Sequence, residues 1–308
     1  MNLDPQASAV LDEIEAASAG RPEPRDAWEK LARARADTNS LARFSGPVPE
    51  ITVELLTMNG RHGPIPVELY RPARGELGSL VWFHGGGAIA GSIATHRAPL
   101  AAIALRSGFA VASVGYRLAP EHPFPEPQED CIDAALGIAE RAADLRLDSS
   151  RIVVGGDSIG GLFATNVARA RKGPPLAGQI LLYPNTDMRS DRAHPSLTDN
   201  DGKLMSRASL AYEADCYIPN LADRHTPFPS PLLADDLAGL PPALLVTCGA
   251  DPLRDEGEAY GDRLAAAGVP LTRRRFPGMI HAFLQMSARI DATDVLVGDI
   301  ADFLRGLR

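Results

Sequence analysis

Short apolar runs separated by stretches with helical periodicity make up most of the chain after residue 78. The runs lie near residues 79–83, 110–114, 151–155, 178–182, 243–248 and 270–276. Apolar runs of this length, alternating with helical stretches, are typical of buried strands joined by helices. The pattern predicts an α/β fold in which one mostly parallel central sheet is flanked by helices on both faces.

The chain before residue 78 has a different pattern. Residues 4–19 and 26–43 have helical periodicity and are separated by a proline-containing segment. Two strand-like segments, residues 51–56 and 65–70, follow with glycines between them, which predicts a β-hairpin.

Residues 185–228 interrupt the later alternation of strands and helices. This segment is polar and rich in turn residues, and only residues 206–217 within it have the pattern of a helix. It is predicted to be an insertion between two strands of the sheet.

Composition narrows the possible classes of function. The chain has 308 residues, 45% of them hydrophobic, which suffices for one α/β domain with a full core. The net charge of −8 argues against a nucleic-acid partner, because such proteins usually carry a basic patch. Three widely spaced cysteines form no metal or redox motif, and no apolar stretch reaches membrane-spanning length. We expect a cytoplasmic protein without membrane insertion, metal or cofactor.

The apolar run at 151–155 leads directly into Gly156-Asp-Ser-Ile-Gly160. A strand that ends in Gly-x-Ser-x-Gly and turns at once into a helix places its serine at the apex of a sharp, strained turn, the nucleophile elbow. The flanking glycines fit this turn because a Cβ there would collide with neighbouring backbone. Ser158 is therefore a candidate nucleophile, although the pentapeptide alone also fits an ordinary strand-to-helix turn.

A second glycine cluster, His84-Gly-Gly-Gly87, follows the apolar run at 79–83. Successive glycines let backbone N–H groups point into a shared cavity, as an oxyanion hole requires. This loop accompanies the elbow in lipases and esterases. The alternatives are a flexible loop or a phosphate-binding loop, and the second fits poorly because no Gly-Lys-Ser/Thr follows. The His84 side chain is expected to brace the loop rather than accept a proton.

The chain has seven histidines that could act as a base for Ser158. His281 lies between the strand-like residues 271–276 and a helical stretch, where the base belongs in hydrolases of chain order serine, acid, histidine. The other five histidines are all expected in loops. Three of them, His62, His194 and His225, are expected to be solvated, and the remaining two are His96 and His122.

The acid is expected after another strand. Asp251 is the first acidic residue beyond the apolar run 243–248, from where its carboxylate can reach an imidazole. Pro252 follows and fits the first turn of a helix, so Asp251 also fits the N-cap of that helix. Asp255 and Glu256 fit the same first turn, where the helix dipole favours acidic side chains.

Together these segments resemble the bacterial hormone-sensitive-lipase-like esterases, the family IV carboxylesterases of the α/β-hydrolase fold. The motifs that carry the resemblance are His84–Gly87, Tyr116–Pro125, Gly156–Gly161, Ser230–Ala234, Gly239–Pro242, Asp251–Glu256 and Gly278–His281. The sequence departs from the family pattern at three positions. Ile159 replaces the usual alanine, Ala88 replaces an aromatic or bulky residue, and Arg97 replaces an acid.

The resemblance implies a serine carboxylesterase that hydrolyses short- to medium-chain acyl esters through an acyl-enzyme, without a cofactor. Ser158, Asp251 and His281 would form its catalytic triad. The residues expected to form or support the oxyanion hole are Gly86, Gly87 and Ile159, with His84, Gly85 and Asp157 in support. Asp157 points the other way along the elbow and is a poorer choice for the triad acid than Asp251.

The resemblance further implies a helical cap over Ser158. Residues 1–45 would supply its N-terminal helices, and residues 185–228 would contribute to it from within a catalytic domain spanning 46–308. Ala88, Leu204, Met205 and Tyr212 are expected to line the substrate pocket, and the larger side chain of Ile159 to alter the shape of its acyl part.

Two other functions stay open on the sequence. An amidase or lactonase could use the same triad, because triad chemistry does not specify the leaving group. A non-catalytic small-molecule receptor could use the same scaffold. The plant gibberellin receptors resemble these esterases but lack a complete triad, whereas Ser158, Asp251 and His281 are all present here. The expected partner is a small-molecule ester, and a homodimer is compatible with the sequence.

Overall fold

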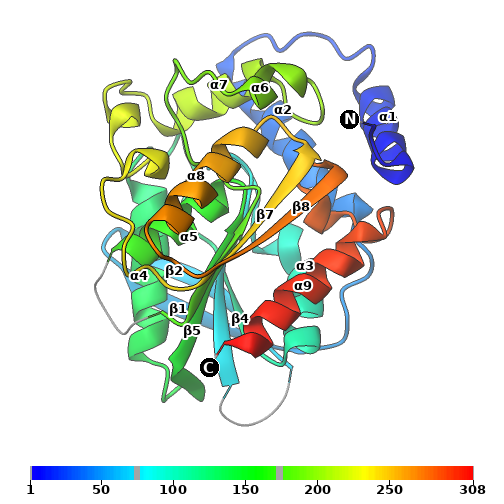
Figure 1. Cartoon of the computed structure of the whole chain (residues 1–308). Coiled ribbons are helices and arrows are strands. Elements are labelled where there is room, and N and C mark those ends of the chain that lie inside the picture. The colour runs from blue at the N-terminus through cyan, green and yellow to red at the C-terminus, as the bar shows by residue number, and fades with distance from the viewer. Residues whose placement is uncertain (1, 73–76, 171–175, 308) are drawn as a thin grey trace.

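The computed structural model describes residues 2–72, 77–170 and 176–307 of the chain (Figure 1). Within these residues, eight strands form one sheet in the order β1-β2-β4-β3-β5-β6-β7-β8. The strands are β1 (Thr52–Gly60), β2 (Gly63–Arg71), β3 (Leu77–Phe83), β4 (Ala110–Val114), β5 (Leu147–Asp157), β6 (Gly178–Leu182), β7 (Ala243–Ala250) and β8 (Leu271–Ile280). The β1–β2 hairpin is antiparallel, and every pairing from β4 to β8 is parallel. The predicted fold class is confirmed.

The helices of the described residues are α1 (Pro5–Ser18), α2 (Ala27–Ser40), α3 (Ile93–Ser107), α4 (Glu126–Glu140), α5 (Ile159–Arg169), α6 (Pro195–Asp199), α7 (Arg207–Tyr217), α8 (Arg254–Ala266) and α9 (Ala292–Gly306). Figure 1 shows α3 and α9 on one face of the sheet and α4, α5 and α8 on the other. Each face buries its own apolar cluster against these helices. All eight residues of β7 are buried, as expected for a parallel strand covered on both sides.

The insertion between β6 and β7 contains more structure than its pattern predicts. The expected helix is α7, which begins after the N-cap Ser206. The short helix α6 and two 3₁₀ turns, Asp223–His225 and Pro231–Leu233, were not predicted. These elements are shorter than two helical turns, so they carry no detectable periodicity.

Helices α2, α6 and α7 lie over the carboxyl ends of the parallel strands (Figure 1). Helix α1 lies beside the end of β8, where the Asp4 N–H donates to the carbonyl of Gly278 (3.0 Å). Two side chains of the same helix contact residues beyond β8: Gln6 exchanges hydrogen bonds with Asp291, and Glu13 pairs with Arg289 at 2.7 Å. The beginning of the described chain is therefore attached to its late part. No helix in the described ranges has the length and apolar character needed to cross a bilayer.

Candidate active site

Ser158 lies at the tip of the turn between β5 and α5. Its φ of 57° is rare for a residue with a side chain, which marks a strained backbone. A Cβ on Gly156 would collide with the backbone of Gly160, and one on Gly160 would collide with the carbonyl of Phe83. Only glycine fits at these two positions. The local geometry is that of the predicted elbow rather than of an ordinary turn.

Asp251 and His281 meet at the carboxyl ends of β7 and β8. The distance from His281 Nδ1 to Asp251 Oδ2 is 2.8 Å, and both side chains are almost completely removed from solvent. Ser158 and His281 both line the same cavity. The structure thus brings together the three residues that the sequence selected, although they lie up to about 120 positions apart in the chain.

The interpretation of Asp251 as a helix N-cap is wrong. Helix α8 begins at Arg254 with Leu253 as its N-cap, so Pro252 lies before the helix and not in its first turn. The Oδ1 atom of Asp251 accepts the N–H of Leu253 at 2.8 Å, a local Asx-type contact that holds the carboxylate in place. The other oxygen is left for His281.

The electrostatic surroundings of His281 favour its charged form. Burial disfavours an imidazolium, but the charge and hydrogen bond of Asp251 outweigh it, and Asp157 and Glu213 add to the effect. The pKa of His281 is therefore raised above its ordinary value. An imidazole in this position gains basicity from its carboxylate partner.

The glycine loop after β3 is held from below by Asp157. This carboxylate accepts the Gly85 N–H (3.1 Å) and Trp82 Nε1–H (3.2 Å), and its Oδ1 lies 3.1 Å from His96 Nε2. Burial opposes its ionisation, but three histidines, His96 foremost and then His84 and His281, hold the pKa of Asp157 below its usual value. The contacts of this carboxylate thus hold the glycine loop and the ring of His96.

His84 packs inside the same loop. Its ring stacks on Tyr116 with 4.2 Å between centroids, and its Nδ1 lies 2.9 Å from the carbonyl oxygen of Gly85. Burial, helped by His96, lowers the pKa of His84 to about 4, so the ring is neutral near pH 7. Gly86 and Gly87 have φ values of 122° and 61° and line the cavity.

The surroundings of two other histidines differ from the prediction. His96 belongs to helix α3 and is buried against Asp157, not in a loop. A capping box of Ser92 and Thr95 starts α3 earlier than its polar first turn suggests. His194 is half-buried and paired with Asp187 at 3.0 Å, so it is not simply solvated.

A cavity of about 460 Å³ contains the site. Residues of α1 and α2 and residues from the segment 204–213 line it, including the predicted pocket residues Leu204, Met205 and Tyr212. Ala88 does not line it: this residue is fully buried in the core on the α4–α5 face of the sheet. The side chain of Ile159 is buried in the same core.

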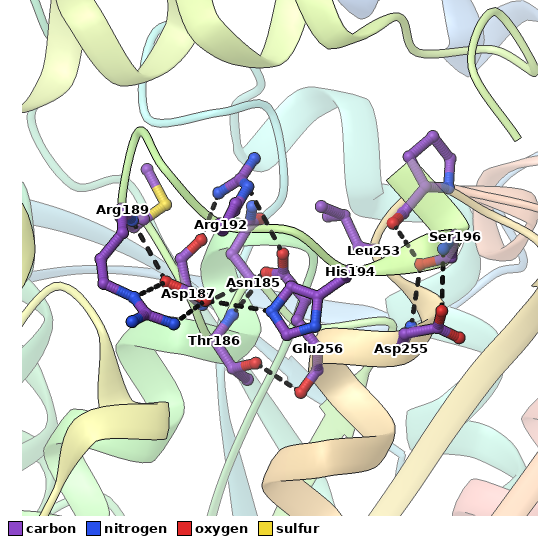
Figure 2. Close-up of polar contacts among 12 residues, drawn as sticks. Asn185, Thr186, Asp187, Arg189, Arg192, His194, Ser196, Leu253, Asp255 and Glu256 are labelled. Carbon is purple, nitrogen blue, oxygen red and sulfur yellow. Dashed lines mark hydrogen bonds and ion pairs between the residues drawn. The ribbon is translucent and has the colours of Figure 1, made fainter. Parts of the chain in front are cut away.

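A buried polar network attaches the insertion to α8 (Figure 2). Glu256 Oε1 accepts the N–H groups of Thr186 (2.8 Å) and Asp187 (3.3 Å), and the Thr186 hydroxyl donates to the Glu256 carbonyl (2.7 Å). Arg192 Nε lies 3.7 Å from Glu256 Oε2. Burial raises the pKa of Glu256 despite these donors. The first residues of the insertion are thus held against the helix that follows Asp251.

Two residues of the site were missed from the sequence. The Ser158 hydroxyl donates to Asn185 Oδ1 at 3.3 Å, a contact with the first part of the insertion that no motif announces. Glu213 of α7 lines the cavity opposite the glycine loop. Its spacing from Ser209 and Tyr212 places it on the same helical stripe as the predicted Tyr212, so periodicity could have found it.

The described residues contain no group of three or more His, Cys, Asp or Glu side chains placed to hold a metal ion. Asp157, Asp251 and His281, at the carboxyl ends of β5, β7 and β8, are instead paired with His96, with each other or with backbone N–H groups. The arrangement is suited to proton transfer between a hydroxyl and an imidazole.

Comparison with known proteins agrees with this geometry. A family model described as alpha/beta hydrolase fold matches residues 80–285. The chain is a member of the hormone-sensitive-lipase-like family of α/β-hydrolases. The resemblance inferred from the motifs is thereby confirmed.

Several members of the family are similar to this chain over nearly its whole length. Carboxylesterase NlhH of Mycobacterium tuberculosis is 36% identical over 308 residues, covering 96% of this chain and 93% of the relative. Ethyl acetate hydrolase of Pseudomonas putida is 35% identical, covering 96% of each chain. The solved structure of a hyperthermophilic esterase from the archaeon Pyrobaculum calidifontis superposes with a TM-score of 0.91 at 34% identity, covering 99% of this chain and 98% of that one.

Proposed function

We propose that the protein is a serine carboxylesterase that hydrolyses short- to medium-chain acyl esters, with Ser158 as its nucleophile. The enzyme class, a carboxylic ester hydrolase, follows from the family and from relatives named as esterases over nearly the whole chain. The observation that carries the assignment of residues is the buried Asp251–His281 hydrogen bond of 2.8 Å beside the strained Ser158 turn.

The reaction begins when Ser158 Oγ attacks the ester carbonyl while His281 takes its proton. Asp251 holds the Nδ1–H of the imidazole, so that Nε2 faces the serine, and stabilises the imidazolium that forms. His281 then gives the proton to the departing alcohol. Water repeats the sequence on the acyl-enzyme and releases the acid.

The oxyanion of each tetrahedral intermediate would lie against backbone N–H groups of Gly86, Gly87 and Ile159. Ile159 is the first residue of α5, so its N–H points out of the helix with the positive end of the helix dipole. The buried Asp157 keeps the glycine loop in position through the Gly85 N–H. Such donors are effective because they are placed before charge develops.

The N-terminal helices and residues 185–228 would act together as the cap over this site. Residues of α1, α2 and α7 line the cavity that contains Ser158, which supports this division of the chain. A cap excludes water from the intermediate and limits the size of the acyl chain. The cavity volume of about 460 Å³ lies toward the lower part of the range usual for small-molecule sites.

The setting of the enzyme belongs to the same proposal. We expect cytoplasmic action on small-molecule esters without metal, cofactor or nucleic acid. Fractionation of the native cells tests the location, and light scattering of the purified protein distinguishes a monomer from a homodimer.

The test of the mechanism is labelling by a fluorophosphonate probe followed by kinetics. The wild-type protein should be labelled at Ser158, and Ser158→Ala or His281→Ala should lower kcat by roughly 10⁴-fold or more with the fold intact. Asp251→Asn should lower kcat somewhat less. Asp255→Asn should leave kcat nearly unchanged, because Asp255 contacts Ser196 and Arg254 rather than His281. Equal damage from the two aspartate variants would refute the assignment of the acid.

The same material separates the esterase from its alternatives. A receptor would leave Ser158 unlabelled. An amidase would turn over a matched anilide at least as fast as the p-nitrophenyl ester of the same acid, and a lactonase would prefer the cyclic ester. We expect the open-chain ester to be fastest.

A further inference from the structure

Glu213 is an ionisable group of the cavity that the mechanism above does not use. A Cβ built on Gly87 would lie 2.5 Å from the carboxyl carbon of Glu213 and 2.8 Å from its Cγ. The carboxyl group therefore faces the glycine loop directly. Among the described residues, no hydrogen bond or ion pair reaches its oxygens.

Keeping an ionised carboxyl group in a cavity costs free energy unless a positive charge or a hydrogen-bond donor pairs with it. Burial raises the pKa of Glu213 to about 7, while the more distant charges of His281 and Arg192 act in the opposite direction. The other ionisable side chains that line the cavity are Glu23, Lys30, Arg33, Asp37, His96, Asp157 and Tyr212. Lys30 is engaged elsewhere, with its ammonium over the ring of Tyr212 at 4.1 Å. Arg33 donates to the carbonyl of Pro22, and Asp157 is taken by His96 and the loop.

We propose that Glu213 is a specificity-determining residue that favours esters whose leaving alcohol carries a positive charge close to the ester oxygen. This inference rests on the proposed role of Ser158. Glu213 stands across from Gly87, where the ester carbonyl would bind, and its charge also acts on His281, which protonates the leaving alcohol. A cation on the alcohol would therefore meet the carboxylate and supply the partner that the protein does not.

The proposal predicts how binding and charge depend on pH. Above a pH of about 7 the carboxylate is ionised and attracts a cation; below it, the neutral carboxylic acid discriminates little by charge. The protonation of His281 affects both substrates of a matched pair equally. A ratio of two kcat/KM values measured at one pH therefore reports Glu213 and not the base.

The experiment compares butyrylcholine with 3,3-dimethylbutyl butyrate, which has the same shape without the charge. In the wild-type protein we expect the ratio of kcat/KM for the cationic ester over the neutral one to rise with pH. In Glu213→Gln the ratio should fall by roughly tenfold or more above pH 8, and its pH dependence should disappear.

Asp215→Asn is the matched control. It removes one negative charge from the same helix, but Asp215 is exposed and pairs with Arg224 outside the cavity. The ratio should stay at the wild-type value in this variant. A second readout is competitive inhibition by free choline, which should weaken in Glu213→Gln and not in Asp215→Asn.

A ratio that is the same in the wild-type protein and in Glu213→Gln would overturn the proposal. So would an equal change of the ratio in the control. Fluorophosphonate labelling is run on every variant, because absence of labelling in the wild-type protein points to a failure of the assigned nucleophile. Normal labelling with an unchanged ratio points to a failure of the role of Glu213 alone.

Discussion

Asp251 and His281 form a buried acid–base pair in which each oxygen of the carboxylate has one task. One oxygen holds the N–H of Leu253 and the other lies 2.8 Å from the imidazole. Because the pair is removed from water, its mutual attraction is stronger than that of a surface pair. The pair therefore sets the protonation state of the site as well as its geometry.

This geometry makes a prediction about pH. The base accepts the serine proton only when it is neutral, and the pKa of His281 is raised above its usual value by Asp251. The rate on a neutral ester should therefore fall on the acidic side, with a midpoint above the value of about 6.5 typical of histidine. The measurement is kcat/KM for p-nitrophenyl butyrate across the pH range in which the fold is intact.

The Asp251→Asn variant supplies the control for that profile. Without the carboxylate charge, the residual activity should show an acidic midpoint shifted to lower pH. In Asp255→Asn the wild-type midpoint should persist. A midpoint in Asp251→Asn equal to that of the wild type would contradict the electrostatic account.

For single residues, the sequence predicts those that belong to motifs and misses those whose role comes from contacts between distant segments. Ser158, Asp251 and His281 each follow an apolar strand, so their approach to one another can be inferred from topology. His96 and Asn185 belong to no motif, and their contacts with Asp157 and Ser158 arise only when distant segments pack. The pairing of Arg97 with the buried Glu68 of β2 is equally invisible in a linear pattern.

Among the elements, the insertion is held by few but buried contacts. Glu256 receives two backbone N–H groups from residues 186 and 187, directly after Asn185. A backbone held in this way cannot shift without leaving buried donors unpaired, which costs about 1 to 3 kcal/mol for each group. The position of Asn185 beside Ser158 thus depends on a helix of the main body.

We expect Glu256→Ala to destabilise the protein by about 3 kcal/mol, because it leaves two buried donors without an acceptor. Glu256→Gln keeps one acceptor oxygen and should cost roughly 1 kcal/mol. Urea denaturation followed by circular dichroism measures both, with the slope of the transition unchanged. A midpoint for Glu256→Ala equal to that of the wild type would show that the network does not hold the insertion.

Element boundaries illustrate what pattern alone determines. Strands β3, β4 and β6 agree with their apolar runs because burial on both faces gives a continuous signal. Strands β1 and β5 extend beyond the predicted runs into polar residues, where backbone pairing with a neighbour continues although side chains are exposed. Strand β8 continues past its run through Pro277 and Gly278 to the buried Met279 and Ile280. Hydrogen bonding between strands leaves no trace in hydrophobicity.

The whole molecule combines one central sheet with a cavity lined by helices from two distant parts of the chain. Helix α2 presents Lys30, Ala34 and Thr38 to the cavity, and α7 presents Ser209 and Glu213. Both sets have the four-residue spacing of one helical stripe. We therefore expect the size of the substrate to be limited by the space between these two helices.

A cavity of limited volume, about 460 Å³, predicts a maximum in acyl-chain length. Each methylene gains about 0.8 kcal/mol on burial until the space is filled, after which crowding costs more than burial returns. In a p-nitrophenyl ester series from acetate to palmitate, kcat/KM should peak at roughly four to eight carbons. A maximum at palmitate, with activation at an oil–water interface, would instead indicate a lipase.

The attachment of α1 to the residues around His281 couples two properties of the enzyme. Asp4, Gln6 and Glu13 contact Gly278, Asp291 and Arg289, on either side of the base, while Ile14 of the same helix lines the cavity. We therefore expect both the entry of substrate into the cavity and the position of His281, the proposed proton acceptor, to depend on α1. An engineer who loosens α1 to admit bulkier esters should find kcat falling as KM improves. A wider range of substrates would then be accompanied by a lower kcat, although α1 does not touch the reacting atoms.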